Sequence, residues 1–194
     1  MTASEMTLGW HTAFGDCPPV SYMLREWFPD RWVRFHSLPG SQRYAENEDE
    51  YVEILRRERV TLRELLGYED EPTELVAVSA SWSGSAEPSP RMPPLETLLP
   101  ADYWQSILLD DSEPEYPSWI HLWISTCPLD DPATDAVLRL VADDATRLVL
   151  LTAAFTWLYA PYDGGADVIA RTTAERDQLK SAHTDWLSAH PLGL

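Results

Sequence analysis

Trp119-Ile-His-Leu-Trp-Ile-Ser-Thr126 alternates aliphatic residues with aromatic and polar ones, and this two-residue period predicts a β-strand with one face in the core. The aliphatic face holds Ile120, Leu122 and Ile124. The opposite face holds Trp119, His121 and Trp123. The fold is therefore expected to be built around a sheet.

A second stretch, Arg31-Trp-Val-Arg-Phe-His-Ser-Leu38, has the same period. Val33 and Phe35 take one face, and Trp32, Arg34 and His36 take the other. If both strands turn their aliphatic side chains to the core, their opposite faces are rich in tryptophan. Tryptophan and arginine are common anchor residues of protein interfaces. We expect these faces to bind a partner, or to be covered by a second layer of helices.

The remaining elements interleave along the chain. Further strands are expected at 75–82, 147–153, 155–159 and 167–170, the last one after a turn at Asp163-Gly164-Gly165. Apolar stripes and capping residues predict helices at 20–28, 44–66 and 132–144 and a C-terminal helix from 173 to near 190, and a short helix is expected over 102–109. This order predicts an α/β or α+β fold over residues 1–194, a single globular domain with helices packed on a mixed β-sheet.

The net charge of the chain excludes some classes of binding partner. The chain has 194 residues, with 14 Lys and Arg against 32 Asp and Glu, a formal net charge of −18. Nucleic acids and anionic membranes attract cationic surfaces, so we expect neither as a partner. The apolar stretch 148–160 is too short to span a membrane, and the first residues lack a signal-peptide pattern, which predicts a cytoplasmic protein.

The sequence contains no local catalytic or metal-binding motif. Cys17 and Cys127 stand apart without metal-ligand spacing and are expected to be buried thiols, and we expect no cofactor and no metal. Acidic residues gather at 46–50 and in the doublets 110–111, 130–131 and 143–144. Each group alone is typical of a helix start or a solvated loop, but together they produce a negative field that speeds capture of a basic partner.

The C-terminal stretch Trp157-Leu-Tyr-Ala-Pro-Tyr-Asp-Gly-Gly-Ala-Asp-Val-Ile169 resembles the motif of the bacterial domain of unknown function 3885. The matching positions are Tyr162, Asp163, Gly165, Asp167 and a closing Trp186. The resemblance covers residues 155–190, with a turn one residue shorter and without the family's arginine. It implies a bacterial origin and small accessory proteins, including immunity-type proteins, and it supplies no catalytic residue.

Three functional hypotheses follow. The first is a binding module, such as an immunity protein that covers a toxin's active surface, and its partner-binding residues are Trp32, Arg34, His36, Trp119, His121, Trp123, Asp163 and Asp167. The second is a hydrolase that pairs Asp163 or Asp167 with His121 or His36, with or without a divalent cation. The third is a regulatory or structural subunit. Asp163 and Asp167 are also typical turn residues that bond their own backbone.

Overall fold

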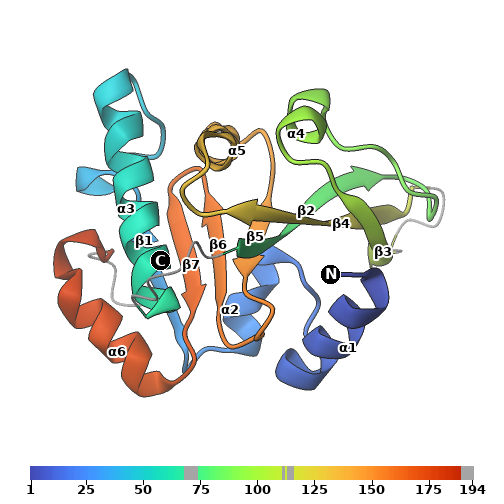
Figure 1. The fold of residues 1–194 in the computed structure, drawn as a ribbon, viewed down its shortest axis with the longest axis horizontal. Helices are drawn as coiled ribbons and strands as arrows, with labels where there is room; N and C mark the ends of the chain where they lie inside the picture. The colour runs from blue at the N-terminus through green and yellow to red at the C-terminus, as the bar shows by residue number, and fades with distance from the viewer. Residues whose placement is uncertain (68–73, 111, 113–115, 189–194) are drawn as a thin grey trace.

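The computed structural model describes residues 1–67, 74–110, 112 and 116–188. Its centre is one seven-stranded sheet in the order β1-β7-β6-β5-β2-β4-β3, with helices on both faces (Figure 1). This architecture confirms the expected sheet with helices packed on it. Every pair of neighbouring strands is antiparallel, so the sheet is antiparallel where a mixed one was expected.

The strands agree with the sequence patterns except at 102–109 and at 155–159, where the strand begins three residues later, at Leu158. They are β1 (Trp32–His36), β2 (Glu74–Ser83), β3 (Asp102–Asp110), β4 (Ser118–Pro128), β5 (Leu148–Leu151), β6 (Leu158–Tyr162) and β7 (Gly165–Ile169). The helix predicted over 102–109 is wrong, because this segment is edge strand β3. The pairing of β3 with β4 has two register shifts, at Tyr103/Gln105 and Leu108/Asp110. They interrupt the alternation of apolar and polar residues along β3, so that its apolar residues have a helix-like spacing.

The helices confirm most of the capping signals. They are α1 (Ala3–Phe14), α2 (Leu24–Trp27), α3 (Glu48–Leu66), α4 (Pro93–Leu98), α5 (Pro132–Ala142) and α6 (Thr173–Ala182), with short 3-10 turns η1 (Ser21–Met23), η2 (Pro39–Ser41) and η3 (Thr184–Trp186). The helix expected over 20–28 is divided into η1 and α2. Helix α1 was not predicted, although Thr2 and Glu5 form a capping box at its start. No helix in the described ranges is long and apolar enough to cross a membrane.

Two hydrophobic cores lie on the two faces of the sheet. Helices α3, α4, α5 and α6 cover one face, and α1 and α2 cover the other. Val33 and Phe35 belong to the first core, whereas Ile120, Leu122 and Ile124 belong to the second. The aliphatic sides of β1 and β4 therefore point in opposite directions, and the two tryptophan-bearing sides predicted for these strands do not form one face.

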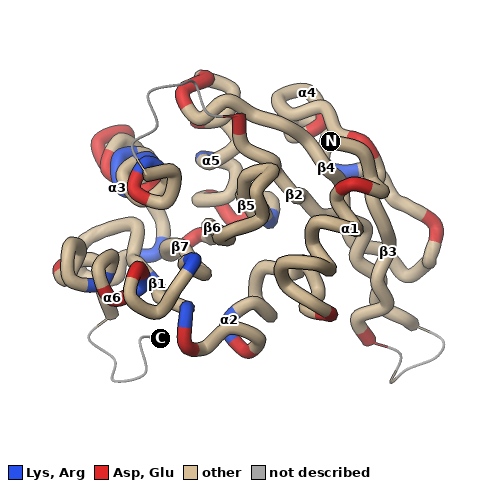
Figure 2. The backbone as a smooth tube through the Cα atoms, turned by 60° about the horizontal axis from the view of Figure 1, so that its bottom comes forward, with Lys and Arg blue, Asp and Glu red and all other residues tan. Residues whose placement is uncertain are grey.

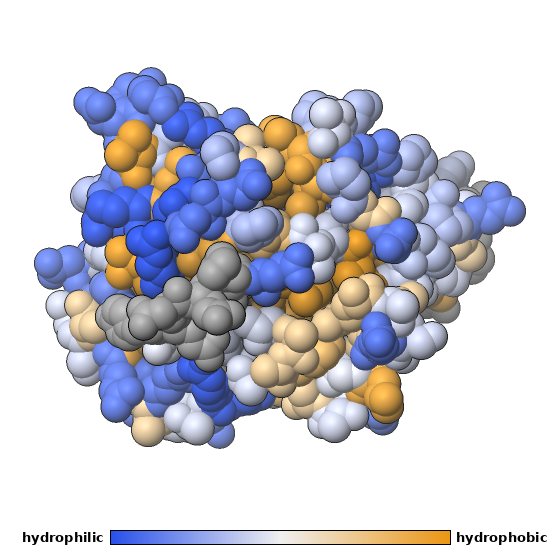
Figure 3. All heavy atoms as spheres, viewed as in Figure 1, coloured by the Kyte–Doolittle hydropathy of each residue, from blue (hydrophilic) through white to orange (hydrophobic). Residues whose placement is uncertain are grey.

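Charged residues are unevenly placed. In Figure 2, Lys and Arg lie mostly among α2, β1, α3, β7 and α6, whereas Asp and Glu are spread over the whole backbone. Figure 3 shows that the side of the molecule carrying α3 and α6 is mostly hydrophilic, with smaller hydrophobic areas nearer the middle. Positive charge is thus concentrated in the half of the molecule that contains the β1 edge of the sheet.

One acidic side chain of α3 is buried in the first core. Glu58 is 2% exposed, and neither of its carboxyl oxygens has a hydrogen-bond partner among the described residues. Burial, with a smaller contribution from the negative charge of Asp135, raises the pKa of Glu58 to about 8. The carboxyl group is therefore protonated in the folded protein at neutral pH.

This burial predicts a pH-dependent stability. The folded pKa lies above the ordinary value of 4.5, so the folded state binds a proton that the unfolded state has lost, and the free energy of unfolding falls as pH rises from 4.5 to about 8. We expect Glu58→Gln to remove this slope and to be more stable than the wild type at pH 8, by on the order of 3 kcal/mol. Urea unfolding of the wild type and Glu58→Gln across this pH range measures the slope. Glu87→Gln, at an exposed position, is the control and should keep it. An unchanged slope in Glu58→Gln would contradict the assignment.

Candidate functional site

The candidate site forms at the turn between β6 and β7. Strand β6 ends at Tyr162 and β7 begins at Gly165, so a turn lies where it was predicted, but it consists of Asp163 and Gly164 alone and Gly165 belongs to the strand. Asp163 and Asp167 are 2% and 4% exposed. An ionised carboxylate buried to this degree requires a cation or several hydrogen bonds, so the question is what holds these two.

Two arginines hold the two carboxylates. Arg34 lies opposite Asp167 in the β1–β7 register, and its Nε and Nη2 donate to Oδ1 and Oδ2 at 2.7 and 2.8 Å. Arg43, in the segment between β1 and α3, donates from Nε to Oδ2 of Asp163. We call these four residues the arginine–aspartate cluster. The paired geometry of Arg34 and Asp167 fixes both side chains, and the hydrogen bond to Asp167 raises the pKa of Arg34.

Aromatic rings pack against the Arg34 side of the cluster. The Arg34 guanidinium carbon lies 5.0 Å from the ring centre of Tyr162 and 5.6 Å from that of Trp32. Burial raises the pKa of the Tyr162 phenol to about 12, so it stays protonated at neutral pH. Arg34 is therefore held by an ion pair at its end and by rings on its sides.

Gly165 allows β1 and β7 to approach each other beside the cluster. A Cβ atom at this position would lie 2.0 Å from the carbonyl oxygen of Phe35 and 3.1 Å from the hydroxyl of Tyr162. The first contact is with backbone, which cannot rotate away. A side chain at residue 165 would therefore force β1 away from β7 and separate Arg34 from Asp167.

This contact predicts the effect of adding one methyl group. We expect Gly165→Ala to lower the free energy of unfolding by about 3 kcal/mol or more, because the clash is with a buried backbone atom. Gly164→Ala is the matched control, since its Cβ would meet a Tyr162 ring carbon at 3.1 Å and Arg43 Cγ at 3.6 Å, both on side chains. Urea unfolding of the two variants measures the difference. Equal losses would contradict this role of Gly165.

A pocket opens over the cluster. Its volume is about 200 Å³, and we call it the arginine pocket; its lining residues are Ser21, Tyr22, Arg34, Arg43, Arg147, Ala160, Tyr162, Asp163 and Asp167. Arg147 precedes β5 and pairs with Asp144. Three of the 14 basic residues thus meet at one cavity of an acidic protein.

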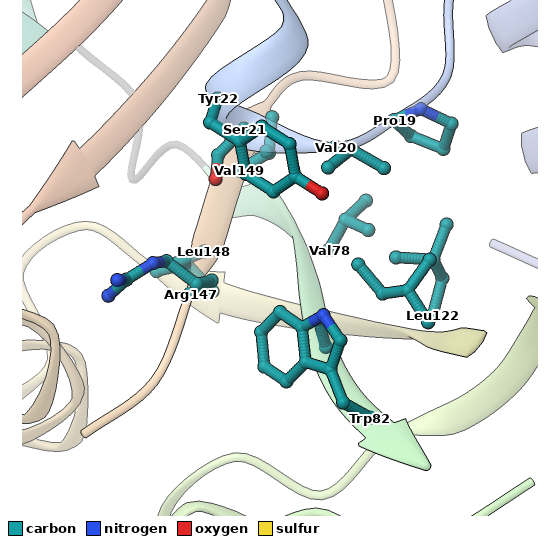
Figure 4. Close-up of a pocket in the computed structure, with 12 residues that line it drawn as sticks. Pro19, Val20, Ser21, Tyr22, Val78, Trp82, Leu122, Arg147, Leu148 and Val149 are labelled. Atoms are coloured by element: carbon teal, nitrogen blue, oxygen red, sulfur yellow. The ribbon is translucent and has the colours of Figure 1, made fainter. Parts of the chain in front are cut away.

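An apolar recess adjoins the arginine pocket and shares Ser21, Tyr22 and Arg147 with it. In Figure 4, Tyr22 and Trp82 stand on opposite sides of this recess, and the guanidinium of Arg147 points away from Val78 and Leu122. Tyr22 and Trp82 are 56% and 43% exposed. Large aromatic side chains with this exposure are typical of surfaces that bind other molecules.

His121 does not reach this site. It lies on the opposite face of the sheet, and β6, β5 and β2 stand between its strand and β7, a separation of about 19 Å at the usual strand spacing. Its side chain is fully buried, with Nε2 2.8 Å from Ser83 Oγ and Nδ1 2.6 Å from Ser106 Oγ. Both ring nitrogens are satisfied, so His121 makes structural hydrogen bonds and does not converge with Asp163 or Asp167.

The other predicted residues are also divided between the two faces. Trp32 and His36 share the face of the arginine pocket, but the Nε1 of Trp32 and the Nε2 of His36 are buried without partners among the described residues. Trp119 and Trp123 share the face of His121, where Trp123 donates to Ser81 Oγ at 3.1 Å. Of the eight residues predicted to bind a partner, the structure brings Arg34, Asp163 and Asp167 together at one pocket.

Sequence patterns did not identify Arg43, Arg147 or Tyr22. Each lies outside the strands and motifs from which the candidates were chosen, and each reaches the pocket only through the fold. No group of three or more His, Cys, Asp or Glu side chains suited to a metal ion occurs within the described part of the chain.

Comparison with known proteins gives one finding. A family model described as Domain of unknown function (DUF3885) matches residues 20–191, which is most of the chain and extends well beyond the C-terminal segment that carries the resemblance. No curated protein and no solved structure matches the chain. The match includes all four residues of the arginine–aspartate cluster.

Proposed function

We propose that this chain, which belongs to the DUF3885 family, is a protein-binding module whose partner docks around the arginine pocket. The observation that carries the proposal is the group of exposed aromatic side chains around this pocket and the recess that adjoins it. Tyr22, Tyr44 and Trp82, which we call the aromatic rim, are 56%, 47% and 43% exposed. Tyr22 lines the pocket, Trp82 stands across the adjoining recess, and Arg43 lies 5.4 Å from the ring centre of Tyr44.

The composition of this surface favours a protein partner. Tyrosine, tryptophan and arginine dominate the residues that contribute most to protein interfaces, because they bury a large area with few rotatable bonds. The floor of the pocket is fixed by two ion pairs whose aspartates are buried, Arg34–Asp167 and Arg43–Asp163. A surface that is already ordered loses little entropy on binding.

Exposed acids beside the pocket favour a basic partner. The fold brings two of the acidic groups of the sequence together: Tyr51 of α3 donates to Asp143 at 2.5 Å, and Arg139 of α5 pairs with Glu48. Asp144 continues this acidic group to Arg147 at the pocket. Asp163 and Asp167 are buried and paired, so the attraction of a basic partner is assigned to the exposed carboxylates, within a chain of net charge −18.

The narrower form of the proposal is a cytoplasmic bacterial immunity-type protein that neutralises a toxin by covering its active surface. It is supported by the family resemblance and by the acidic charge, which suits a basic enzyme as partner.

The test is capture of the partner from the native host with tagged wild-type and variant proteins. We expect Trp82→Ala and Tyr22→Ala each to weaken binding of the captured basic protein at least about tenfold, because truncating a central aromatic anchor of an interface costs about 2 kcal/mol. Tyr116→Ala, which removes an aromatic ring that is 76% exposed at the β3–β4 connection, is the matched control and should bind as the wild type does.

Kinetics with the purified pair test the electrostatic part. Added salt should lower the association rate more than it raises the dissociation rate, and Asp143→Asn with Glu48→Gln should reproduce part of that loss at low salt. Equal binding by the rim variants and the wild type would contradict the proposed surface. An association rate that does not depend on salt would contradict the role of charge.

A further inference from the structure

We propose that the interior of the arginine pocket binds a small oxyanion, a carboxylate or a phosphoryl group, through Arg43, Arg147 and the hydroxyl groups beside them. This inference concerns the pocket itself and does not depend on a protein partner at the aromatic rim. It rests on the balance of hydrogen-bond donors and acceptors that line the cavity.

The three guanidinium groups of the pocket carry more N–H donors than the hydrogen bonds they make within the protein. A guanidinium carries five N–H groups. Arg34 uses Nε and Nη2 for Asp167, Arg43 uses Nε for Asp163, and Arg147 uses Nη1 for Asp144. The remaining N–H groups of the three side chains have no acceptor in the described part of the protein, and they belong to residues that line one cavity.

Hydroxyl groups add to this surplus. Ser21 and Tyr22 come from η1 and Tyr162 from the end of β6, and all three line the same cavity. Burial raises the pKa of both phenols, so each remains protonated and able to donate at neutral pH. The pocket thus presents N–H and O–H donors from five separate segments of the chain.

The carboxylates of the pocket are already paired with arginine. Both oxygens of Asp167 accept from Arg34, and Asp163 accepts from Arg43. The carboxylates that face the three guanidiniums are Asp144, Asp163 and Asp167, so positive and negative charges balance here, in contrast to the net charge of −18 over the whole chain. Each of these carboxylates is paired with an arginine, so a cation would have to compete with a guanidinium, whereas an oxyanion would find unpaired donors in a region without excess negative charge.

The size of the pocket limits the ligand. A volume of about 200 Å³ lies below the roughly 300 Å³ at which sites for drug-sized molecules begin. Bidentate contact with planar guanidinium groups suits a carboxylate or a phosphoryl group equally well. We therefore assign the site to the oxyanion shared by both classes, and separate the two by experiment.

The probes are inorganic phosphate and acetate, each compared with sodium chloride at the same ionic strength, because any salt screens the self-repulsion of so acidic a protein. We expect phosphate or acetate to raise the midpoint of thermal unfolding above the chloride value, and titration calorimetry to give a saturable binding curve. A response to phosphate alone identifies a phosphoryl site, and a response that includes acetate identifies a carboxylate site.

Variants locate the bound anion. Arg43→Gln and Arg147→Gln should each weaken binding about tenfold, as expected for loss of one charged hydrogen-bond donor. Arg176→Gln, which removes an equal charge from α6 where Arg176 pairs with Asp177, should bind as the wild type does. Arg34 is left unchanged, because both side chains of its pair with Asp167 are largely buried and breaking the pair risks unfolding, whereas the Arg43 side chain is mostly exposed. Equal effects of all salts, or a response that survives in both Arg43→Gln and Arg147→Gln, would overturn the proposal.

Discussion

The ion pair between Arg34 and Asp167 is the constraint on which the site depends. Asp167 is almost fully buried at the centre of β7, where an ionised carboxylate without a partner would be strongly destabilising. The antiparallel register places Arg34 directly opposite, and removing one member of such a pair typically costs about 3–5 kcal/mol. Because the pair requires β1 and β7 to be close, it also requires glycine at residue 165, and the turn before this glycine buries Asp163 next to Arg43. One buried carboxylate therefore explains the glycine, the turn and the floor of the pocket.

The acidic residues of this chain have two different roles. Asp163 and Asp167 are inside the protein and matched by arginine, so they add structure without adding to the outer negative field. Glu48, Asp143 and Asp144 are at the surface, where they hold Arg139, Tyr51 and Arg147 in place and still contribute to the long-range potential. Both groups contribute equally to the formal net charge of the chain. Only the second group is able to attract a partner from a distance.

Sequence periodicity predicted most elements, because the segments of β1 and β4 alternate in polarity and the starts of α3, α5 and α6 carry capping residues. It failed at 102–109, where the register shifts of β3 replace the two-residue period. Periodicity also does not reveal which way a strand faces: the aliphatic sides of β1 and β4 enter opposite cores, so their tryptophans never share a surface. The aspartates of the site were found from a local motif, whereas Arg43 and Arg147 come from distant segments that only the folded chain brings to the motif.

The outer strand β3 has a further consequence for how the molecule behaves in concentrated solution. An edge strand carries unpaired backbone N–H and C=O groups, and a strand of a neighbouring molecule can pair with them and extend the sheet. Here the two register shifts break the row of free peptide groups into short pieces, and Asp102 and Asp110 place like charges at either end. A second copy that approached this border would meet repulsion and mismatched spacing along its length, so stacking of the protein into extended aggregates is opposed at this edge of the sheet.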